Sequence, residues 1–389
     1  MDKIEEVSFY NKKMQEEKKL GKYNIMFNIC TNTQLQFIDS ILEEINERNI
    51  NFSCYLSCDY DVSEYIKDTI WSDIPFTTSD VARELQYTDA FLETEIYGRG
   101  PKNAEKIFIG HGQPNKINNW SEENLKSFEH YFLYGELERS MFDIVIQKNP
   151  KVAEHIKYYN VGYPKLDKQI RGIYNRNEIL ISMGLNPDFK TVIYAPAWDP
   201  GCSLRKYGMQ IVSLLLSMEK VNVIVKLHPA SIVGRNSPYW DFYTGGVMWE
   251  EKFRIFCENN RFKYVGDVPV NPFLVAADVL ITDFSGVALE FMILDRPVVY
   301  IDCPEFYERT LKEWGCDANI AKYDDRFNAG RNVGYLIEDI DLLQTAVIHA
   351  FNNPMELSPK RKALINQFLY NPGNGASATV DAILKILNK

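Results

Sequence analysis

Two successive series of apolar, β-rich runs, each alternating with amphipathic segments, constrain the fold of this 389-residue chain more than any other feature. Strands that alternate with helices indicate parallel βαβ units. The first series predicts strands at residues 23–29, 51–56, 106–109 and 131–134, with helices at 34–48 and 63–71. The second predicts strands at residues 191–195, 221–227, 264–265, 279–282 and 298–301, with helices at 207–218, 248–258 and 285–294. Two such series predict an α/β protein with two doubly wound, Rossmann-like domains that face each other across a cleft.

The domain boundaries are expected where this pattern changes. Residues 1–22 carry dense mixed charge and predict a mostly solvated helix. We expect a first Rossmann-like domain at 23–160, a connection at 161–190, a second Rossmann-like domain at 191–358 and C-terminal helices at 359–389. A composition of 46% hydrophobic and 25% charged residues is ordinary for a globular protein and excludes a disordered, collagenous or coiled-coil chain.

Charge and cysteine content narrow the classes of partner. Lys and Arg number 43 and Asp and Glu number 53, and the net charge of −10 argues against nucleic acid. The seven scattered cysteines form no C-x-x-C pair, which predicts reduced core residues and a cytoplasmic protein. The charged N-terminus is unlike a signal peptide, and no run of ~18 uncharged apolar residues predicts a membrane span. The net charge of −10 predicts at most weak peripheral contact with an anionic membrane surface.

The first candidate site is the segment Gly110-His111-Gly112, which directly follows the strand predicted at 106–109. Glycines on both sides of the histidine let the backbone approach a ligand closely, so Gly112 is a candidate contact for phosphate or acceptor. An imidazole titrates near neutral pH and suits general base catalysis. Lys116, in the same loop, could hold a phosphate group. The alternative is a structural turn with an incidental histidine.

The second candidate is His228, which lies between Lys226 and Pro229 at the end of the strand predicted at 221–227. Pro229 stops the strand and fixes the turn. The alternative is a histidine that only caps the strand end through a backbone hydrogen bond. Two histidines at equivalent strand ends, one in each domain, are harder to explain as structural residues alone.

The third candidate follows the strand predicted at 279–282. Thr282 and Asp283 end the strand, and Ser285 and Gly286 open a helix, whose free N–H groups and small residues favour an anion. Glu290, about one turn later, could accept hydrogen bonds from ribose hydroxyls. An ordinary helix cap is the alternative, and it is compatible with phosphate binding.

A fourth candidate is the segment that holds Pro196 and Trp198, after the strand predicted at 191–195. Trp198 could form a wall of the cleft, although lone aromatic residues more often serve packing. The sequence contains no G-x-G-x-x-G, G-x-x-x-x-G-K-[ST] or G-x-S-x-G motif, which disfavours dinucleotide oxidoreductases, P-loop enzymes and α/β hydrolases. No metal-ligand set stands out, and we expect no cofactor. Dependence on Mg²⁺ is left open.

The order of these motifs resembles the CDP-glycerol glycerophosphotransferases, which prime or polymerise teichoic acids and related capsular polymers. The resemblance extends from about residue 106 to residue 302. The matching segments are GHGxPxK at 110–116, VGYPKLD at 161–167, YAPAW at 194–198, KLHP at 226–229, DVLITDFS at 278–285, EF at 290–291 and RPV at 296–298. Departures at Gln113 and Gly286 bear on substrate identity more than on the class of reaction.

The resemblance implies a GT-B-like architecture in which the second domain holds most of a CDP-polyol donor, with CDP-glycerol favoured. An acceptor hydroxyl of a lipid-linked chain or polymer would attack the β-phosphorus, and CMP would leave. It implies that the turn from Thr282 to Gly286 holds the pyrophosphate and that Glu290 holds the ribose. His111 would be the base and His228 would contact the transferred phosphate, although these two roles could be exchanged. Lys116 and Lys226 would be further phosphate contacts.

Two alternatives remain at this point. A GT-B glycosyltransferase that uses a UDP- or CMP-sugar shares the helix-start anion site, and only its preference for the nucleotide base distinguishes it. A subunit that binds nucleotide or polymer without turnover is the non-enzymatic alternative.

Overall fold

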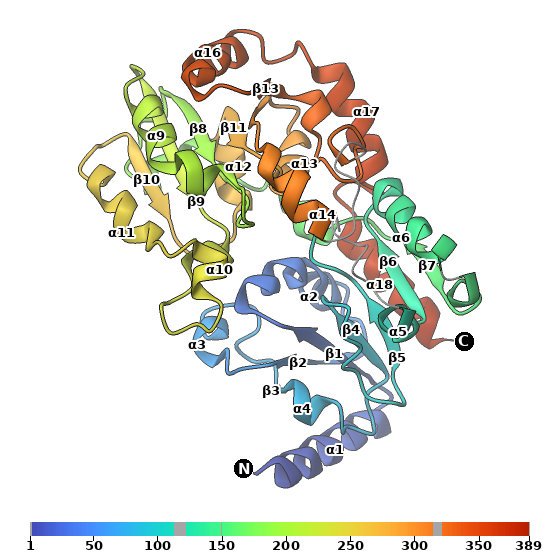
Figure 1. The fold of residues 1–389 in the computed structure, drawn as a ribbon. Coiled ribbons are helices and arrows are strands. Elements are labelled where there is room, and N and C mark those ends of the chain that lie inside the picture. Colours follow the sequence, from blue (N-terminus) through green and yellow to red (C-terminus); the bar gives the residue numbers. More distant parts are fainter. Residues whose placement is uncertain (1, 113–121, 149, 314–320, 389) are drawn as a thin grey trace. The chain divides into compact units, whose positions relative to one another are not determined.

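The computed structural model describes residues 2–112, 122–148, 150–313 and 321–388 (Figure 1). These residues form two compact units. Unit 1 contains the described residues up to 168 together with 369–388, and unit 2 contains the described residues between 169 and 368. The segment 161–190, expected as a connection, is thus divided between the two units, and the end of the chain returns to unit 1.

A parallel sheet forms the centre of unit 1. In the described residues it has seven strands in the order β3-β2-β1-β4-β5-β6-β7. Its strands are β1 (Tyr23–Ile29), β2 (Phe52–Cys58), β3 (Phe76–Thr78), β4 (Ala90–Glu93), β5 (Glu105–Phe108), β6 (His130–Leu133) and β7 (Lys157–Asn160). Each strand pair of this sheet is parallel in the described residues, and β1 is buried at six of its seven positions, as expected for a strand covered on both faces. The order reverses between β1 and β4, which makes the carboxyl ends of these strands the expected ligand site.

Helices cover both faces of this sheet. They are α1 (Lys3–Lys19), η1 (Asn32–Phe37), α2 (Asp39–Glu47), α3 (Ser63–Ile66), α4 (Ser79–Ala82), α5 (Glu122–Lys126), α6 (Glu136–Lys148), η3 (Pro150–Val152), η4 (Pro164–Leu166), α7 (Asp167–Ile170, which crosses into unit 2) and α18 (Gly375–Leu387). The C-terminal α18 packs on α2, with Ile383 in the same apolar cluster as Ile41 (Figure 1). Tyr10 and Met14 of α1 are buried in a second cluster, so this helix covers the sheet more closely than its charge predicts.

Unit 2 repeats the architecture with a parallel sheet of six strands in the described residues, ordered β10-β9-β8-β11-β12-β13. Its strands are β8 (Lys190–Tyr194), β9 (Val221–Lys226), β10 (Phe262–Val265), β11 (Val279–Thr282), β12 (Val298–Ile301) and β13 (Tyr335–Ile337). Its helices are α8 (Arg176–Ser182), α9 (Ser203–Leu216), η5 (Pro229–Ile232), α10 (Trp240–Thr244), α11 (Trp249–Phe253), η6 (Arg254–Phe256), α12 (Asn271–Ala276), α13 (Val287–Met292), η7 (Phe306–Thr310), α14 (Leu311–Glu313), η8 (Arg331–Val333), η9 (Ile340–Leu342), α16 (Leu343–Asn352) and α17 (Ser358–Phe368). Here the order reverses between β8 and β11.

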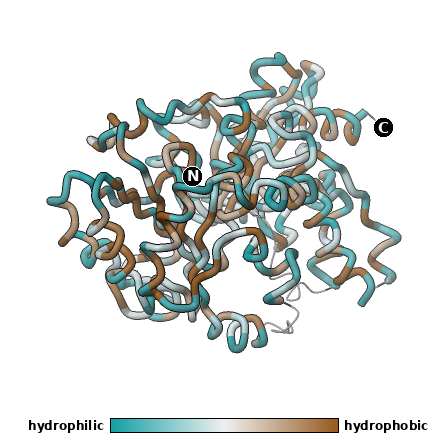
Figure 2. The backbone as a smooth tube through the Cα atoms, turned by 90° about the horizontal axis from the view of Figure 1, so that it is seen from above, coloured by the Kyte–Doolittle hydropathy of each residue, from teal (hydrophilic) through white to brown (hydrophobic). Residues whose placement is uncertain are grey.

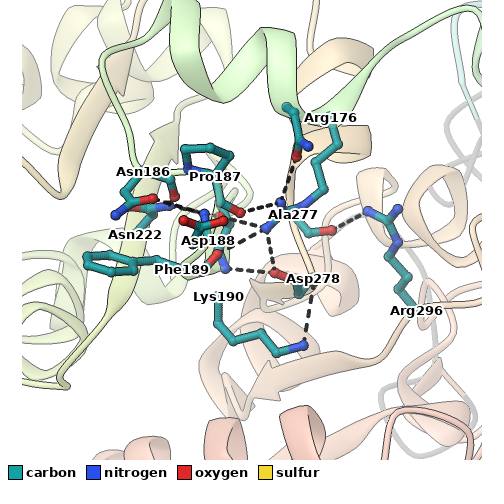
Figure 3. Close-up of polar contacts among 12 residues, drawn as sticks. Arg176, Asn186, Pro187, Asp188, Phe189, Lys190, Asn222, Ala277, Asp278 and Arg296 are labelled. Atoms are coloured by element: carbon teal, nitrogen blue, oxygen red, sulfur yellow. Dashed lines mark hydrogen bonds and ion pairs between the residues drawn. The ribbon is translucent and has the colours of Figure 1, made fainter.

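A polar network fixes the amino ends of β8 and β11 (Figure 3). The guanidinium of Arg176 lies 3.2 Å from the Asp278 carboxylate, which also accepts a 2.8 Å hydrogen bond from the Thr191 amide. Arg296 donates to the carbonyls of Val275 and Ala277. These contacts lie at the end of the sheet opposite the carboxyl ends, where ligands of such sheets bind.

Hydropathy along the backbone fits helices that each bury one face. Figure 2 shows hydrophilic and hydrophobic residues interleaved along the coils. Among the helices of the described residues, none has the length and apolarity needed to cross a membrane. The six cysteines in the described part of the chain are all free thiols, and Cys316 lies outside the described residues. The expectation of core residues holds for Cys58, Cys202 and Cys303, which are buried, and is wrong for Cys257, which is exposed.

Candidate active site

His111 stands at the carboxyl end of β5 with a defined ring orientation. Its Nδ1 lies 2.9 Å from the backbone oxygen of Thr94, the residue that follows β4. A carbonyl oxygen only accepts, so Nδ1 carries the proton and the neutral ring keeps its lone pair at Nε2. The histidine side chain is 47% exposed. His111 can therefore receive a proton at Nε2 from a group that approaches from solvent.

The two glycines beside His111 have positive φ angles, +63° at Gly110 and +140° at Gly112. A Cβ atom at Gly110 would lie 2.9 Å from the Tyr134 hydroxyl, which donates a 2.7 Å hydrogen bond to the Ile109 carbonyl. Glycine thus lets the backbone turn tightly over Tyr134 and present His111. Lys116, the expected phosphate contact in this loop, lies outside the described residues.

An aromatic stack supports the same edge of unit 1. The rings of Tyr134 and Tyr163 are 4.1 Å apart and nearly parallel, and Phe37 stacks on Tyr163 at 6.0 Å. Phe37 in turn lies 6.0 Å from His111 in an edge-to-face arrangement. These three rings also line a small cavity with Ile41 and other apolar residues. The sequence analysis missed this stack because Phe37, Tyr134 and Tyr163 lie far apart in the sequence and only the fold brings their rings together.

His228 follows β9 in unit 2 and has the opposite ring orientation. Its Nδ1 accepts a 3.1 Å hydrogen bond from the Ala230 amide and thereby caps η5. The neutral ring must then carry its proton at Nε2, which makes this atom a donor. The ring of Trp198 is 6.0 Å away at an angle of 37°. His228 therefore does form the backbone hydrogen bond that the structural alternative expected. The same bond fixes the ring of this exposed residue with Nε2 as the donor.

Asp283, at the end of β11, is buried and accepts four hydrogen bonds. Its Oδ1 accepts from the amides of Ala197 and Phe284 at 2.9 and 2.7 Å, and its Oδ2 accepts from the Ser203 amide and hydroxyl, both at 2.8 Å. Burial raises the pKa of this carboxyl, and the hydrogen bonds oppose that rise. Thr282 donates to the Ala195 carbonyl at 2.7 Å. Both side chains thus hold the loop that carries Pro196 and Trp198.

The remaining donor-site candidates differ in accessibility. Ser285 and Gly286 are partly exposed, and a Cβ atom added to Gly286 would meet no atom within 4 Å. Glu290 on α13 and Lys226 at the end of β9 are each only 7% exposed. The Lys226 ammonium donates a 2.9 Å hydrogen bond to the Leu227 carbonyl. Ser285 and Gly286 are therefore the accessible residues of this turn, whereas Glu290 is buried.

Topology brings the unit 2 candidates together. Strand β8 lies between β9 and β11, so the loops that carry Trp198, His228 and Ser285 leave neighbouring strands at one edge of the sheet. In unit 1, β4 and β5 are neighbours, which explains the contact between His111 and Thr94.

A group of potential metal ligands lies at the opposite, amino-terminal ends of β5 and β6. Among the described residues, ligand atoms of Glu105, Glu129 and His130 lie within 4.8 Å of one another. The buried His130 contacts Glu105 through Nε2 at 2.8 Å and the Tyr159 hydroxyl through Nδ1 at 3.0 Å. The sequence analysis did not find this group because its members belong to different elements. Its position separates it from His111, at the other end of β5.

Part of the chain matches a known family. Residues 140–317 match the model of the CDP-Glycerol:Poly(glycerophosphate) glycerophosphotransferase family. A teichoic acid poly(glycerol phosphate) polymerase of Bacillus spizizenii is 25% identical over 54% of this chain and 55% of its own length. A teichoic acid glycerol-phosphate primase of Bacillus subtilis is 30% identical over 36% of this chain and 32% of its own length. The matched segments thus span about half or less of these relatives.

Solved structures show similarity at the level of the fold. The wall teichoic acid polymerase TagF, in one variant, matches 99% of this chain and 94% of its own with a TM-score of 0.71 and 15% identity. A TagF variant soaked with CDPG scores 0.66 over 94% of this chain and 88% of its own. The expected GT-B-like α/β fold is confirmed by this match. Residues 140–317 of the chain therefore match the model of the CDP-glycerol:poly(glycerophosphate) glycerophosphotransferase family, and the chain is similar to teichoic acid polymerases and primases.

Proposed function

We propose that this protein transfers glycerol phosphate from CDP-glycerol to a hydroxyl of a teichoic acid or capsular polymer acceptor and releases CMP. The observation that carries the proposal is the pair of opposite histidine tautomers. The Thr94 carbonyl leaves a lone pair on Nε2 of His111, whereas the Ala230 amide leaves a proton on Nε2 of His228. A phosphoryl transfer to an alcohol needs one group of each kind, a proton acceptor for the nucleophile and a donor for the phosphoryl oxygens.

The proposed reaction assigns each proton and bond. The acceptor oxygen forms a bond to the β-phosphorus while the bond from that phosphorus to the CMP oxygen breaks. Nε2 of His111 takes the proton of the acceptor hydroxyl. Nε2 of His228 donates a hydrogen bond to an oxygen of the transferred phosphoryl group, and the Ser285-Gly286 turn receives the pyrophosphate. Glu290 and Lys226 are both mostly buried, so we assign them to the interior side of this site.

The acceptor and the place of action follow from the same proposal. We place the reaction in the cytoplasm, at the inner face of the membrane, where a lipid-linked acceptor presents its terminal hydroxyl. The net charge of −10 predicts weak adhesion to anionic lipid, which sedimentation with anionic vesicles measures. Tight sedimentation in both low and high salt would contradict this part of the proposal.

The donor is tested first by thermal shift. A ligand that binds only the folded protein raises the melting temperature by mass action. We expect CDP-glycerol to raise it more than CDP-ribitol, CMP, UDP or a UDP-sugar does. CMP release in the presence of a lipid-linked glycerol phosphate oligomer, with and without Mg²⁺, then measures transfer. A shift with UDP-sugars alone would favour a GT-B glycosyltransferase, and donor binding without CMP release across acceptors would favour a binding subunit.

A further inference from the structure

A second acceptor for the His111 proton lies beside the Thr94 carbonyl. Oε1 of Glu95, the second residue after β4, is 3.4 Å from Nδ1 of His111. The Nδ1–H group therefore faces a backbone oxygen and a carboxylate together. A carboxylate in this position favours the imidazolium that forms when Nε2 takes a proton. The sequence motifs gave no reason to select Glu95.

Gln34 of η1 holds the Glu95 carboxylate. Its Nε2 donates a 2.7 Å hydrogen bond to Oε1 of Glu95. Its Oε1 accepts from the Cys30 amide at 2.6 Å and from the Thr94 hydroxyl at 2.8 Å. Because the Cys30 amide can only donate, the Gln34 oxygen must face it and the Gln34 nitrogen must face Glu95. Gln34 is 5% exposed, so its amide has one orientation in a closed network.

Glu95 is the carboxylate that can stabilise a positive charge on His111, because the neighbouring acidic residues are protonated or paired. The next carboxyl on this strand end, Glu93, is buried, and burial raises its pKa to about 8, so it is mostly protonated at neutral pH. Arg99 pairs with Asp59 and donates its amide to Glu93 at 3.0 Å. Within the described part of the chain, Glu95 is the acidic side chain in contact with His111.

The Lys165 ammonium of η4 lies 4.8 Å from the centre of the Phe37 ring, and this ring in turn contacts the imidazole of His111 in an edge-to-face arrangement.

We infer that Glu95, held by Gln34, is a positioning residue for the base His111. It fixes the Nδ1–H tautomer together with Thr94 and stabilises the positive charge on the ring during transfer. This inference rests on the proposed function, because the charge matters only if His111 receives a proton. Gln34 does not contact His111 in this proposal and acts on it only by holding Glu95. Neither Gln34 nor Glu95 is proposed to contact substrate.

The chain contains a matched control pair. Glu105 lies 2.8 Å from Nε2 of His130, at the amino end of the same strand β5. Glu105→Gln therefore makes the same chemical change beside a different histidine, away from the site. Glu95→Gln keeps an oxygen for the Gln34 hydrogen bond and removes only the charge. Glu95→Asp keeps the charge on a shorter side chain.

The kinetic test compares these variants in CMP release. We expect Glu95→Gln to lower kcat by about 10- to 100-fold, as outer partners of a reactive histidine do, with KM for CDP-glycerol within about twofold of wild type. Gln34→Leu should lower kcat less, Glu95→Asp should retain more activity than Glu95→Ala, and Glu105→Gln should match wild type. Unchanged kcat in Glu95→Gln, in an active enzyme, overturns the inference.

A spectroscopic readout separates this inference from the proposed function. The protein has five histidines, so the ring signals can be assigned with single His→Gln variants. In ¹H–¹⁵N spectra we expect a downfield, slowly exchanging Nδ1 proton for His111, which moves upfield or exchanges faster in Glu95→Gln and is unaffected in Glu105→Gln. If the wild-type protein transfers no polyol phosphate, the proposed function fails. The Nδ1 proton signal of His111 then still tests whether Glu95 holds the His111 ring. A His111 signal insensitive to Glu95→Gln overturns the positioning role.

Discussion

Asp283 and Ser203 are joined by two hydrogen bonds, one from the Ser203 amide and one from its hydroxyl, both 2.8 Å long. They connect the end of β11 to the start of α9, although 80 residues separate them in sequence. The same carboxylate accepts the Ala197 amide. One buried side chain thus fixes the loop that carries Trp198 against the strand that leads to Ser285, which gives the carboxyl edge of the unit 2 sheet a defined shape.

Replacing this carboxylate should disrupt the loop. In Asp283→Asn one oxygen becomes an NH₂ group that cannot accept from Ser203, so buried donors lose their partners at a cost of about 2–4 kcal/mol. We expect a lower melting temperature and weaker CDP-glycerol binding. Ser203→Ala, which removes only the hydroxyl, should cost about 1 kcal/mol. Equal stability of Asp283→Asn and wild type in urea unfolding would contradict this account.

His111→Asn should separate folding from catalysis. The asparagine amide can still donate to the Thr94 carbonyl, but it offers no lone pair where Nε2 stood. General base catalysis typically contributes 10²–10⁴-fold, so we expect kcat to fall by about that factor. CDP-glycerol should still raise the melting temperature of the variant, because the proposed donor site lies in unit 2 and His111 lies in unit 1. A variant with half of the wild-type turnover would exclude His111 as the base.

His228 allows a comparison of two isosteric replacements. In His228→Asn, Oδ1 can replace Nδ1 and cap the Ala230 amide, while the Nε2 donor is lost. His228→Gln places a donor near the Nε2 position but gives up the cap. We expect the Asn variant to melt near wild type with kcat lower by about 100-fold, and the Gln variant to be less stable by about 1 kcal/mol. Calorimetry and CMP release measure the two effects. The reverse ranking in stability would show that the cap does not orient the ring.

The sequence predicts the strands best where both sheet faces are covered. The predicted ranges 23–29, 279–282 and 298–301 coincide with β1, β11 and β12, because such strands are continuously apolar. The strands missed at the sheet edges, β3, β7 and β13, are short or partly exposed and lack this signal. The central strand β4 (Ala90–Glu93) was also missed although it is fully buried, because an apolar run of four residues that ends in glutamate is too short to stand out. The single helix expected at 34–48 is divided at Ile38 into η1 and α2.

Some residues of the candidate site can be found from the sequence, and others only from the fold. Gly110-His111-Gly112 and Lys226-Leu227-His228-Pro229 are local signals, since glycine, histidine and proline at a strand end are visible in sequence. Gln34 and Glu95 are not, because only the pairing of β1 with β4 places the residues that follow these strands together. The tautomers of both histidines depend on backbone atoms and are visible only in three dimensions.

Two glycines should respond in opposite ways to alanine. Gly110→Ala combines a φ of +63° with a Cβ 2.9 Å from the Tyr134 hydroxyl, and we expect a loss of about 1–3 kcal/mol in stability. Gly286 has φ −58° and open space, so Gly286→Ala should fold at least as well as wild type. If the pyrophosphate occupies that space, KM for CDP-glycerol rises in Gly286→Ala. Unchanged KM would remove the Ser285-Gly286 turn from the donor site.

Stability should fall as the pH rises because of a buried acid in unit 1. Burial raises the pKa of Glu138 from 4.5 to about 8, and its Oε2 accepts a 2.6 Å hydrogen bond from the Tyr134 amide. Between these two values the unfolded chain has lost this proton while the folded protein keeps it, so unfolding releases a proton and is favoured by higher pH. Glu93, with a pKa of about 8, acts in the same direction.

Glu138→Gln tests this dependence, since the amide oxygen can still accept from Tyr134 and no charge can form. We expect the melting temperature of the variant, relative to wild type, to be higher at pH 8 than at pH 5. The change from pH 5 to pH 8 should also be smaller in the variant. Glu138→Leu is the control, because it leaves the Tyr134 amide without its acceptor and should destabilise at both pH values. A difference between Glu138→Gln and wild type that is the same at pH 5 and pH 8 would show that Glu138 titrates alike in the folded and unfolded chain.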